Sequence, residues 1–190
     1  MPTLSVAYPI NKKISQKIDL ESRNFTYLNN EYQLKAKHLE ILNSTKLRLS
    51  ETKSAAIGVR YRVELDKNSE NEFRLHQQYE WQKNKASIFQ QRLRMEERIY
   101  RSQTKFRLRY KSGFAFDMES FCDVLNLSNE LMVELTKYAR SDYEERLLAE
   151  AEWELKDKTK LAVGTQYRLS DFTHKPSHNI FITAGLTFNL

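Results

Sequence analysis

The stretch NIFITAGLTFNL, residues 179–190, alternates apolar and polar side chains with a period of two. Its odd positions are polar or glycine, with Phe181 as the one exception. Its even positions carry Ile180, Ile182, Ala184, Leu186, Phe188 and Leu190. Successive side chains of a β-strand point to opposite faces, so this period predicts a strand with one apolar and one polar face.

The same alternation recurs along the rest of the chain. In residues 54–65, for example, Ile57, Val59 and Tyr61 alternate with Arg60 and Arg62. The pattern is clear in residues 54–65, 72–82, 86–99, 104–116 and 159–171, and weaker in residues 3–10, 14–27 and 36–50. Each of these segments predicts a further strand.

Two segments, residues 124–139 and 143–155, are ambiguous because they are rich in Leu, Glu and Ala, which favour helices. A helix would place Glu150 and Glu154 on the same face as Leu147, which is poor amphipathicity. Read with a period of two, the apolar residues separate cleanly from the glutamates. We therefore predict a strand for each segment.

The predicted strands are about eleven in number and roughly 9–15 residues long, whereas strands of soluble proteins most often have about 5–6 residues. A strand that crosses a membrane needs about 9–11 residues, with one face toward lipid and the other toward the lumen. Aromatic residues such as Tyr8, Trp81, Tyr100 and Trp153 fall near predicted strand ends, as in interfacial girdles. We predict an all-β fold, a transmembrane antiparallel up-and-down β-barrel made of one domain, residues 1–190.

Antiparallel barrels of single bacterial chains close with an even number of strands. We therefore expect one strand more than the pattern shows, giving about twelve, with ten as the alternative and both termini at the periplasmic side. Counting back from Leu190, the turns expected outside are Leu28–Lys35, Asp66–Asn71, Tyr100–Gln103, Arg140–Asp142 and Asp171–Ser177.

The composition fits this architecture. Of the 190 residues 40% are hydrophobic and 29% charged, and no stretch has the roughly 20 apolar residues of a transmembrane helix. Aromatic residues make up 12%, which argues against disorder, and the single cysteine, Cys122, excludes an intramolecular disulfide. Residues 1–20 show no secretion signal. For a bacterial outer-membrane location, we expect the signal peptide to be removed or not included.

The net charge of +6 would by itself suggest nucleic acid or an anionic surface as partner. In a barrel, however, the polar faces point inward, and their charges are sorted by sign along the chain. Strands within residues 54–111 carry mainly Arg and Lys, and the two strands between residues 124 and 155 carry mainly Glu. We expect a charge-filled lumen in which these walls pair. The candidate residues of this network are Arg60, Arg62, Arg92, Arg94, Arg107, Arg109, Glu130, Glu134, Glu150 and Glu152.

Four motifs resemble a known family. They are RYRVE (60–64), QRLRMEER (91–98), FRLRYKSG (106–113) and HNIFITAGLTFNL (178–190). Together they are similar to the outer-membrane β-barrel family catalogued as domain of unknown function 2490. The resemblance implies a barrel of Gram-negative outer membranes with no assigned activity, and it supplies no catalytic residues. The N-terminus departs from the family, since the usual early aromatic strand is not evident.

No catalytic or cofactor motif accompanies these strands. The four glycines are scattered, and the histidines, His38, His76, His174 and His178, lack metal-ligand spacing. We expect no enzyme activity, no cofactor, no metal and no nucleic-acid partner. The favoured function is an accessory or structural subunit of a larger outer-membrane complex, in contact with lipid and with another outer-membrane protein. The alternatives are a small channel for solutes or ions and, less favoured, a soluble basic β protein.

Overall fold

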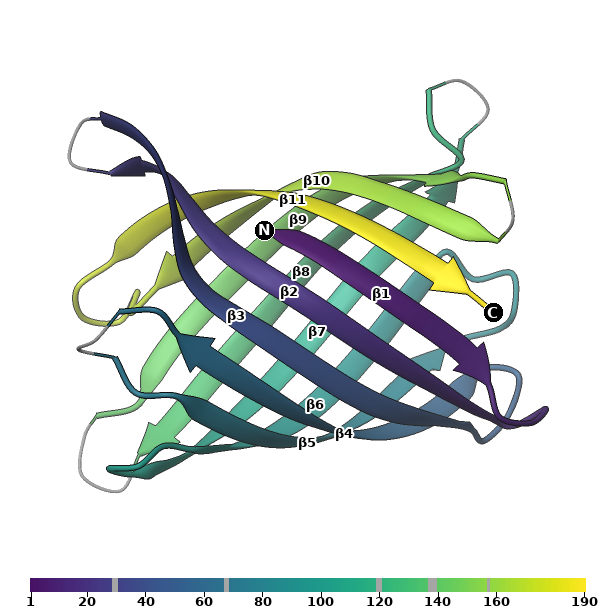
Figure 1. Ribbon diagram of the computed structural model, residues 1–190. Coiled ribbons are helices and arrows are strands. Elements are labelled where there is room, and N and C mark those ends of the chain that lie inside the picture. The colour runs from purple at the N-terminus through teal and green to yellow at the C-terminus, as the bar shows by residue number, and fades with distance from the viewer. Residues whose placement is uncertain (29–30, 67–68, 119–120, 137–139, 157) are drawn as a thin grey trace.

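The computed structural model describes residues 1–28, 31–66, 69–118, 121–136, 140–156 and 158–190, and the side chains of residues 25–35 are not described. The described residues form eleven strands (Figure 1). Their bounds are β1 Pro2–Pro9, β2 Ile14–Leu28, β3 Glu31–Arg48, β4 Lys53–Glu64, β5 Glu72–Gln82, β6 Phe89–Ile99, β7 Thr104–Asp117, β8 Val124–Thr136, β9 Asp142–Glu154, β10 Thr159–Ser170 and β11 Ser177–Asn189. The all-β prediction is confirmed, including strands for both ambiguous segments.

Each strand pairs with its neighbours in sequence, and the sheet closes on itself where β1 meets β11. The pairs between consecutive strands are antiparallel, as predicted. The closing pair is parallel, with Leu4 beside Leu186 and Val6 beside Phe188.

The expected count of about twelve strands, with ten as the alternative, is therefore wrong. The even-number rule holds only when the first and last strands are antiparallel, and here a parallel β1–β11 pair lets eleven strands close. The expectation that both termini share one side is also wrong. β1 begins part-way along the wall, opposite Ala184, and runs to the rim at which β11 ends (Figure 1).

The strands β2, β4, β6, β8 and β10 all end at the end of the barrel opposite to Leu190, as the count along the chain predicted (Figure 1). Most of the first predicted turn, Leu28–Lys35, is strand, because β2 ends at Leu28 and β3 begins at Glu31. Parts of two of the predicted turns, residues 29–30 and 67–68, lie outside the described residues.

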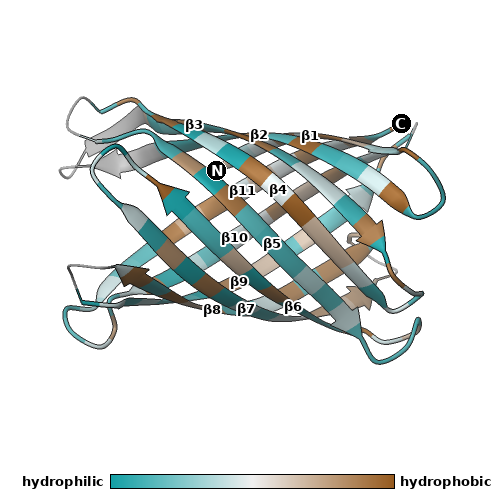
Figure 2. Ribbon diagram, turned by 90° about the horizontal axis from the view of Figure 1, so that it is seen from below, coloured by the Kyte–Doolittle hydropathy of each residue, from teal (hydrophilic) through white to brown (hydrophobic). Residues whose placement is uncertain are grey.

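The kinds of side chain that are buried in this barrel are the reverse of those buried in a soluble domain. Among the described residues, the buried hydrophobic side chains are only those of Leu42, Ala56, Cys122 and Met132, whereas many charged ones are buried. Apolar side chains form the outward face, and Ile57, Met95 and Ile180 are 65%, 61% and 74% exposed. Figure 2 shows the resulting alternation of apolar and polar residues along each strand.

Aromatic side chains gather near both ends of the outer wall. At the end where the chain terminates, Trp81 lies 5.6 Å from Tyr79 and 6.4 Å from Tyr110, measured between ring centroids. At the same end Phe114 lies 5.0 Å from Phe89. At the opposite end, Tyr143 and Phe172 are in contact at 5.9 Å. The outward apolar band therefore runs between two groups of aromatic rings.

Candidate functional site

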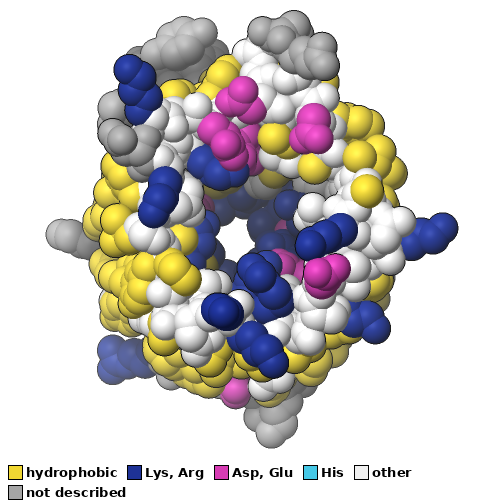
Figure 3. Space-filling model, turned by 90° about the vertical axis from the view of Figure 1, so that its right-hand side faces the viewer, with side chains coloured by type: hydrophobic (Ala, Val, Ile, Leu, Met, Phe, Trp, Pro, Cys, Tyr) yellow, Lys and Arg dark blue, Asp and Glu magenta, His cyan; other side chains and the backbone are white. Residues whose placement is uncertain are grey.

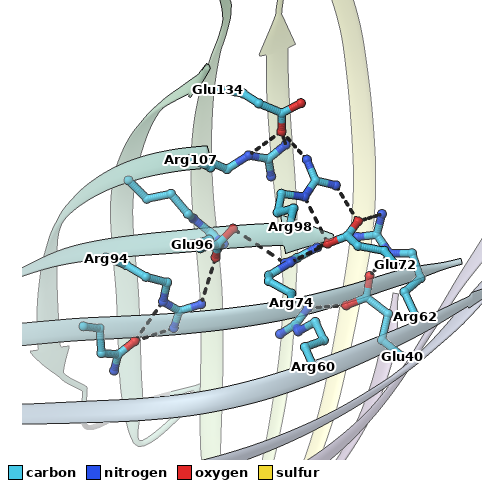
Figure 4. Close-up of polar contacts among 12 residues, drawn as sticks. Glu40, Arg60, Arg62, Glu72, Arg74, Arg94, Glu96, Arg98, Arg107 and Glu134 are labelled. Atoms are coloured by element: carbon cyan, nitrogen blue, oxygen red, sulfur yellow. Dashed lines mark hydrogen bonds and ion pairs between the residues drawn. The ribbon is translucent and has the colours of Figure 1, made fainter. Parts of the chain in front are cut away.

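The inward faces of β3 to β8 carry many charged residues, which brings acidic and basic side chains together inside the barrel (Figure 4). On β6, for example, Arg92, Arg94, Glu96 and Arg98 all point inward because they are two residues apart. The cluster described below, the lumenal network, comprises Glu40, Glu72, Glu96, Glu130 and Glu134 with Arg60, Arg62, Arg74, Arg92, Arg94, Arg98, Lys105, Arg107 and Arg109.

Glu72 on β5 is the centre of the lumenal network and is 1% exposed. Its Oε1 accepts hydrogen bonds from Arg74 Nε at 2.6 Å and Arg98 Nε at 3.0 Å. Its Oε2 accepts from Arg98 Nη2 at 2.6 Å and from the Tyr100 hydroxyl at 2.8 Å, and Arg62 Nη1 lies 3.3 Å away. Such multiple charge-assisted bonds are the arrangement in which a buried carboxylate is tolerated.

Glu40 and Glu134 lie at two ends of the lumenal network. Glu40 on β3 accepts hydrogen bonds from Arg60 and Arg62 of the next strand. Glu134 on β8 accepts from Arg107 Nε at 3.0 Å, pairs with Lys105 at 3.0 Å, and also accepts from Arg98. Because Arg62 and Arg98 each also contact Glu72, they connect both ends to the centre.

Glu96 and Glu130 continue the lumenal network toward the other half of the lumen. Arg109 bridges them, with Nη1 2.7 Å from Glu96 Oε1 and Nη2 2.5 Å from Glu130 Oε2. Arg92 Nη2 donates to Glu130 Oε1 at 2.7 Å. Arg74 Nη1 lies 3.7 Å from Glu96 and so links this part to Glu72. The result is one connected series of ion pairs across six neighbouring strands.

Tyr100 closes the lumenal network at the turn that follows β6. Its ring lies under two cations, 5.4 Å from Arg98 and 5.7 Å from Lys105. Burial raises the pKa of the Tyr100 phenol, and the neighbouring Glu72 carboxylate, to which its hydroxyl donates, raises that pKa further while Arg98 lowers it. The hydroxyl therefore stays protonated and serves as a donor.

Comparison with known protein families gives a match over most of this barrel. The family model described as "Protein of unknown function (DUF2490)" matches residues 2–179, which is most of the chain. The chain belongs to the DUF2490 family. No curated protein and no solved structure matched this chain. The suspected family resemblance is thus confirmed, while the family description assigns no location or activity.

In this DUF2490 barrel the residues expected to pair are only partly brought together. Arg92 and Arg109 meet Glu130, Arg107 meets Glu134, and Arg60 and Arg62 meet Glu40. Arg94 instead donates to Gln78 at 2.9 Å and lies 3.6 Å from Glu96 on its own strand. Glu152 pairs with Lys160 at 2.8 Å, and among the described side chains Glu150 has no ion pair within 4.0 Å.

The pairing of two opposed walls is therefore not the arrangement found. Most ion pairs join residues of the same or adjacent strands, because side chains reach their neighbours along the wall more readily than the far side. Five members of the lumenal network were not among the predicted residues: Glu40, Glu72, Arg74, Glu96 and Arg98. For Glu72, Arg74, Glu96 and Arg98 the signal was present, since each lies at an inward position two residues from an opposite charge, as in Glu72-x-Arg74 and Arg94-x-Glu96-x-Arg98.

Phe181, the exception to the alternation of the last strand, lies on the inward face of β11 in this DUF2490 barrel. Its ring contacts Arg168, whose guanidinium carbon is 4.4 Å from the ring centroid, and Arg23, at 5.3 Å. A cation over an aromatic face is an attractive arrangement. The inward-facing Phe181 thus contacts two arginines, which the alternation alone did not predict.

His38 and His76 face inward and are buried, and they are not arranged like metal ligands in the described part of the chain. His38 is 0% exposed, with its Nε2 3.3 Å from Glu40 and its Nδ1 3.6 Å from Glu64. His76 fills the space left by Gly58, where an added Cβ would come within 2.3 Å of the imidazole. In the described part of the chain no group of three or more potential ligands could hold a metal ion, and no helix is long and apolar enough to cross a membrane.

Proposed function

We propose that this protein is an integral outer-membrane β-barrel whose lumen is closed by the lumenal network, and that it serves as a non-enzymatic accessory or structural subunit of a larger outer-membrane complex. The observation that carries the proposal is the reversed polarity of the wall. An outward band of Leu, Ile, Val and aromatic side chains encircles a charged interior. Such exposure is unfavourable in water and matches the lipid-facing band of membrane barrels.

The closed sheet supports the same proposal. A barrel leaves no long open sheet edge, and every backbone group in lipid needs an internal partner. The strands, mostly of 11–15 residues, are long enough to cross a bilayer at the usual tilt. In native cells, the protein should sediment with outer membranes and require detergent for extraction, and a monomer that stays soluble without detergent would exclude this function.

A polar pair on the outer wall supports the subunit role. Asn129 on β8 shares the outward face with Leu127 and Leu131, and its amide donates to Glu145 on β9 at 2.8 Å. Beside this pair lies a groove of about 470 Å³, lined by Phe114, Leu127, Leu147, Thr165 and Tyr167 among others. Polar groups on a lipid-facing wall are costly unless another polar group meets them.

We therefore place the contact with a second outer-membrane protein at the groove on β7 to β10. The first of these strands, β7, carries Phe106, Leu108, Tyr110 and Phe114. The partner would insert apolar side chains into the groove and one hydrogen-bonding group opposite Asn129. Extraction of native membranes with mild detergent should recover a complex well above the 22.6 kDa of this chain.

The variant Asn129→Leu should abolish that complex while the barrel still folds. Asn43→Leu is the matched control, because Asn43 accepts a comparable 2.8 Å hydrogen bond from Gln16 on strands away from the groove. Recovery of the wild type only as a free monomer in several mild detergents would remove the support for a subunit role. Equal loss of the complex in both variants would remove the support for this contact surface.

One observation favours a channel as the second candidate function. The inward faces of β10, β11 and β1 carry small side chains such as Ala162, Gly164, Thr183 and Ser5, in contrast to the arginines of the opposite wall. Large, stable conductance of the wild-type barrel in a planar bilayer would favour the channel over the closed subunit.

A further inference from the structure

The half of the lumen nearest the C-terminal rim is hollow. A cavity of about 960 Å³, here called the vestibule, opens there and extends inward to Arg92, Lys111 and Glu150. The vestibule is lined by the ends of the strands and by the turns that follow β1 and β3. Figure 3 looks into this end and shows a hollow with Lys and Arg side chains, and some Asp and Glu, around its opening. Its volume is in the range of pockets that hold small molecules, which is about 300–1,000 Å³.

The charge of the vestibule is unbalanced, unlike that of the lumenal network. Its lining includes seven Lys or Arg side chains and three Glu side chains, an excess of four positive charges. Lys46 is matched by Glu80 at 2.5 Å. No ion pair within 4.0 Å involves Lys111 or Arg48 among the described side chains. A concave, water-filled surface of one sign concentrates solutes of the opposite charge.

Two of these cations are direct neighbours. Arg92 on β6 and Lys111 on β7 are cross-strand partners, and both point into the vestibule. Like charges directly opposite each other on a sheet are destabilising. Arg92 uses Nη2 for Glu130, but its buried Nε has no hydrogen-bond partner among the described residues. Two neighbouring cations, one of which has no ion pair among the described side chains, form an arrangement that an anionic group would complete.

We propose that the vestibule binds a small soluble solute that carries at least two phosphate groups. One phosphate lies beside the Arg92 guanidinium and the Lys111 ammonium, where it separates the two cations. A second phosphate lies nearer the rim, where Arg48 also lines the vestibule. Arginine and lysine are the usual phosphate ligands, since the guanidinium fork and the ammonium both donate to phosphate oxygens.

The test is calorimetric titration of the folded, detergent-solubilised barrel with inorganic pyrophosphate, inorganic phosphate and citrate. Pyrophosphate should bind more tightly than phosphate, and a rise in salt should weaken both. Lys111→Gln should weaken pyrophosphate binding about tenfold or more, because it removes a charged donor. This variant breaks no ion pair, so it should fold, and Arg48→Gln provides a second test at the rim.

Lys156→Gln is the matched control. Lys156 is an exposed residue of the turn after β9 at the same end, and it does not line the vestibule. The same loss of charge there should leave pyrophosphate affinity within about twofold. The proposal would be overturned by the absence of pyrophosphate binding, by equal effects of all three substitutions, or by tighter binding of citrate than of pyrophosphate.

Discussion

At the scale of single residues, the lumenal network depends on carboxylates that each serve several cations. Glu72 alone contacts Arg62, Arg74, Arg98 and Tyr100. Removal of its charge leaves Arg74 and Arg98, both less than 9% exposed, without their main partner. Glu72→Gln should therefore lower the free energy of unfolding by about 3–5 kcal/mol, measured by urea titration of the barrel in detergent.

The control for this prediction is Glu154→Gln. Glu154 pairs with Lys160 at 2.8 Å, but its side chain is 63% exposed at the rim. An exposed pair contributes about 0–1 kcal/mol, so this variant should unfold near the wild-type urea concentration. Similar midpoints for Glu72→Gln and Glu154→Gln would show that the lumenal network does not stabilise the barrel.

Which residues face the lumen followed from the sequence, but which of them pair did not. The period of two placed Arg60, Arg92 and Glu130 inward, because side-chain direction in a strand depends only on parity. Their partners depend on the register between strands and on side-chain reach. Neither quantity is visible in one sequence, so Glu150 was expected in the lumenal network and Glu72 was overlooked.

At the scale of elements, the sequence pattern identified eleven strands, and all eleven are present. The error was the added twelfth strand, which came from the rule for antiparallel closure. The residues of the short first strand, β1, do not indicate whether its second neighbour, β11, runs parallel or antiparallel to it. The parallel closure is therefore known only from the structure, in which β1 pairs with β11.

The parallel closure predicts a specific cross-link. Ala7 on β1 and Asn189 on β11 are register partners near the rim. With Cys122 replaced by serine, the pair Ala7→Cys and Asn189→Cys should form a disulfide on mild oxidation, detected by peptide mapping. The control pair Ala7→Cys and Gly185→Cys lies four residues out of register and should not. Efficient cross-linking of the control pair in place of the first would contradict the closure.

At the scale of the whole molecule, most charged side chains of the strands lie inside and most apolar ones outside, so much of the basic composition belongs to the lumen. Six strands contribute to the lumenal network, which spans the wall from β3 to β8. We expect the wild-type barrel, reconstituted in a planar bilayer, to show no large stable conductance, because paired arginines and glutamates occupy the lumen. Persistent porin-like openings would contradict a closed lumen.

The most direct test of the central claim asks which face of the wall meets lipid. β11 suits this test, because its inward residues Thr183, Gly185 and Thr187 are small and its outward residues are Ala184, Leu186 and Phe188. Single nitroxide-labelled cysteines at positions 183–188, in a Cys122→Ser background and in lipid vesicles, report collisions with oxygen dissolved in the bilayer. We expect high oxygen accessibility at positions 184, 186 and 188 and low values at 183, 185 and 187. Accessibility without this period, or a water-soluble nickel reagent reaching the even positions, would contradict it.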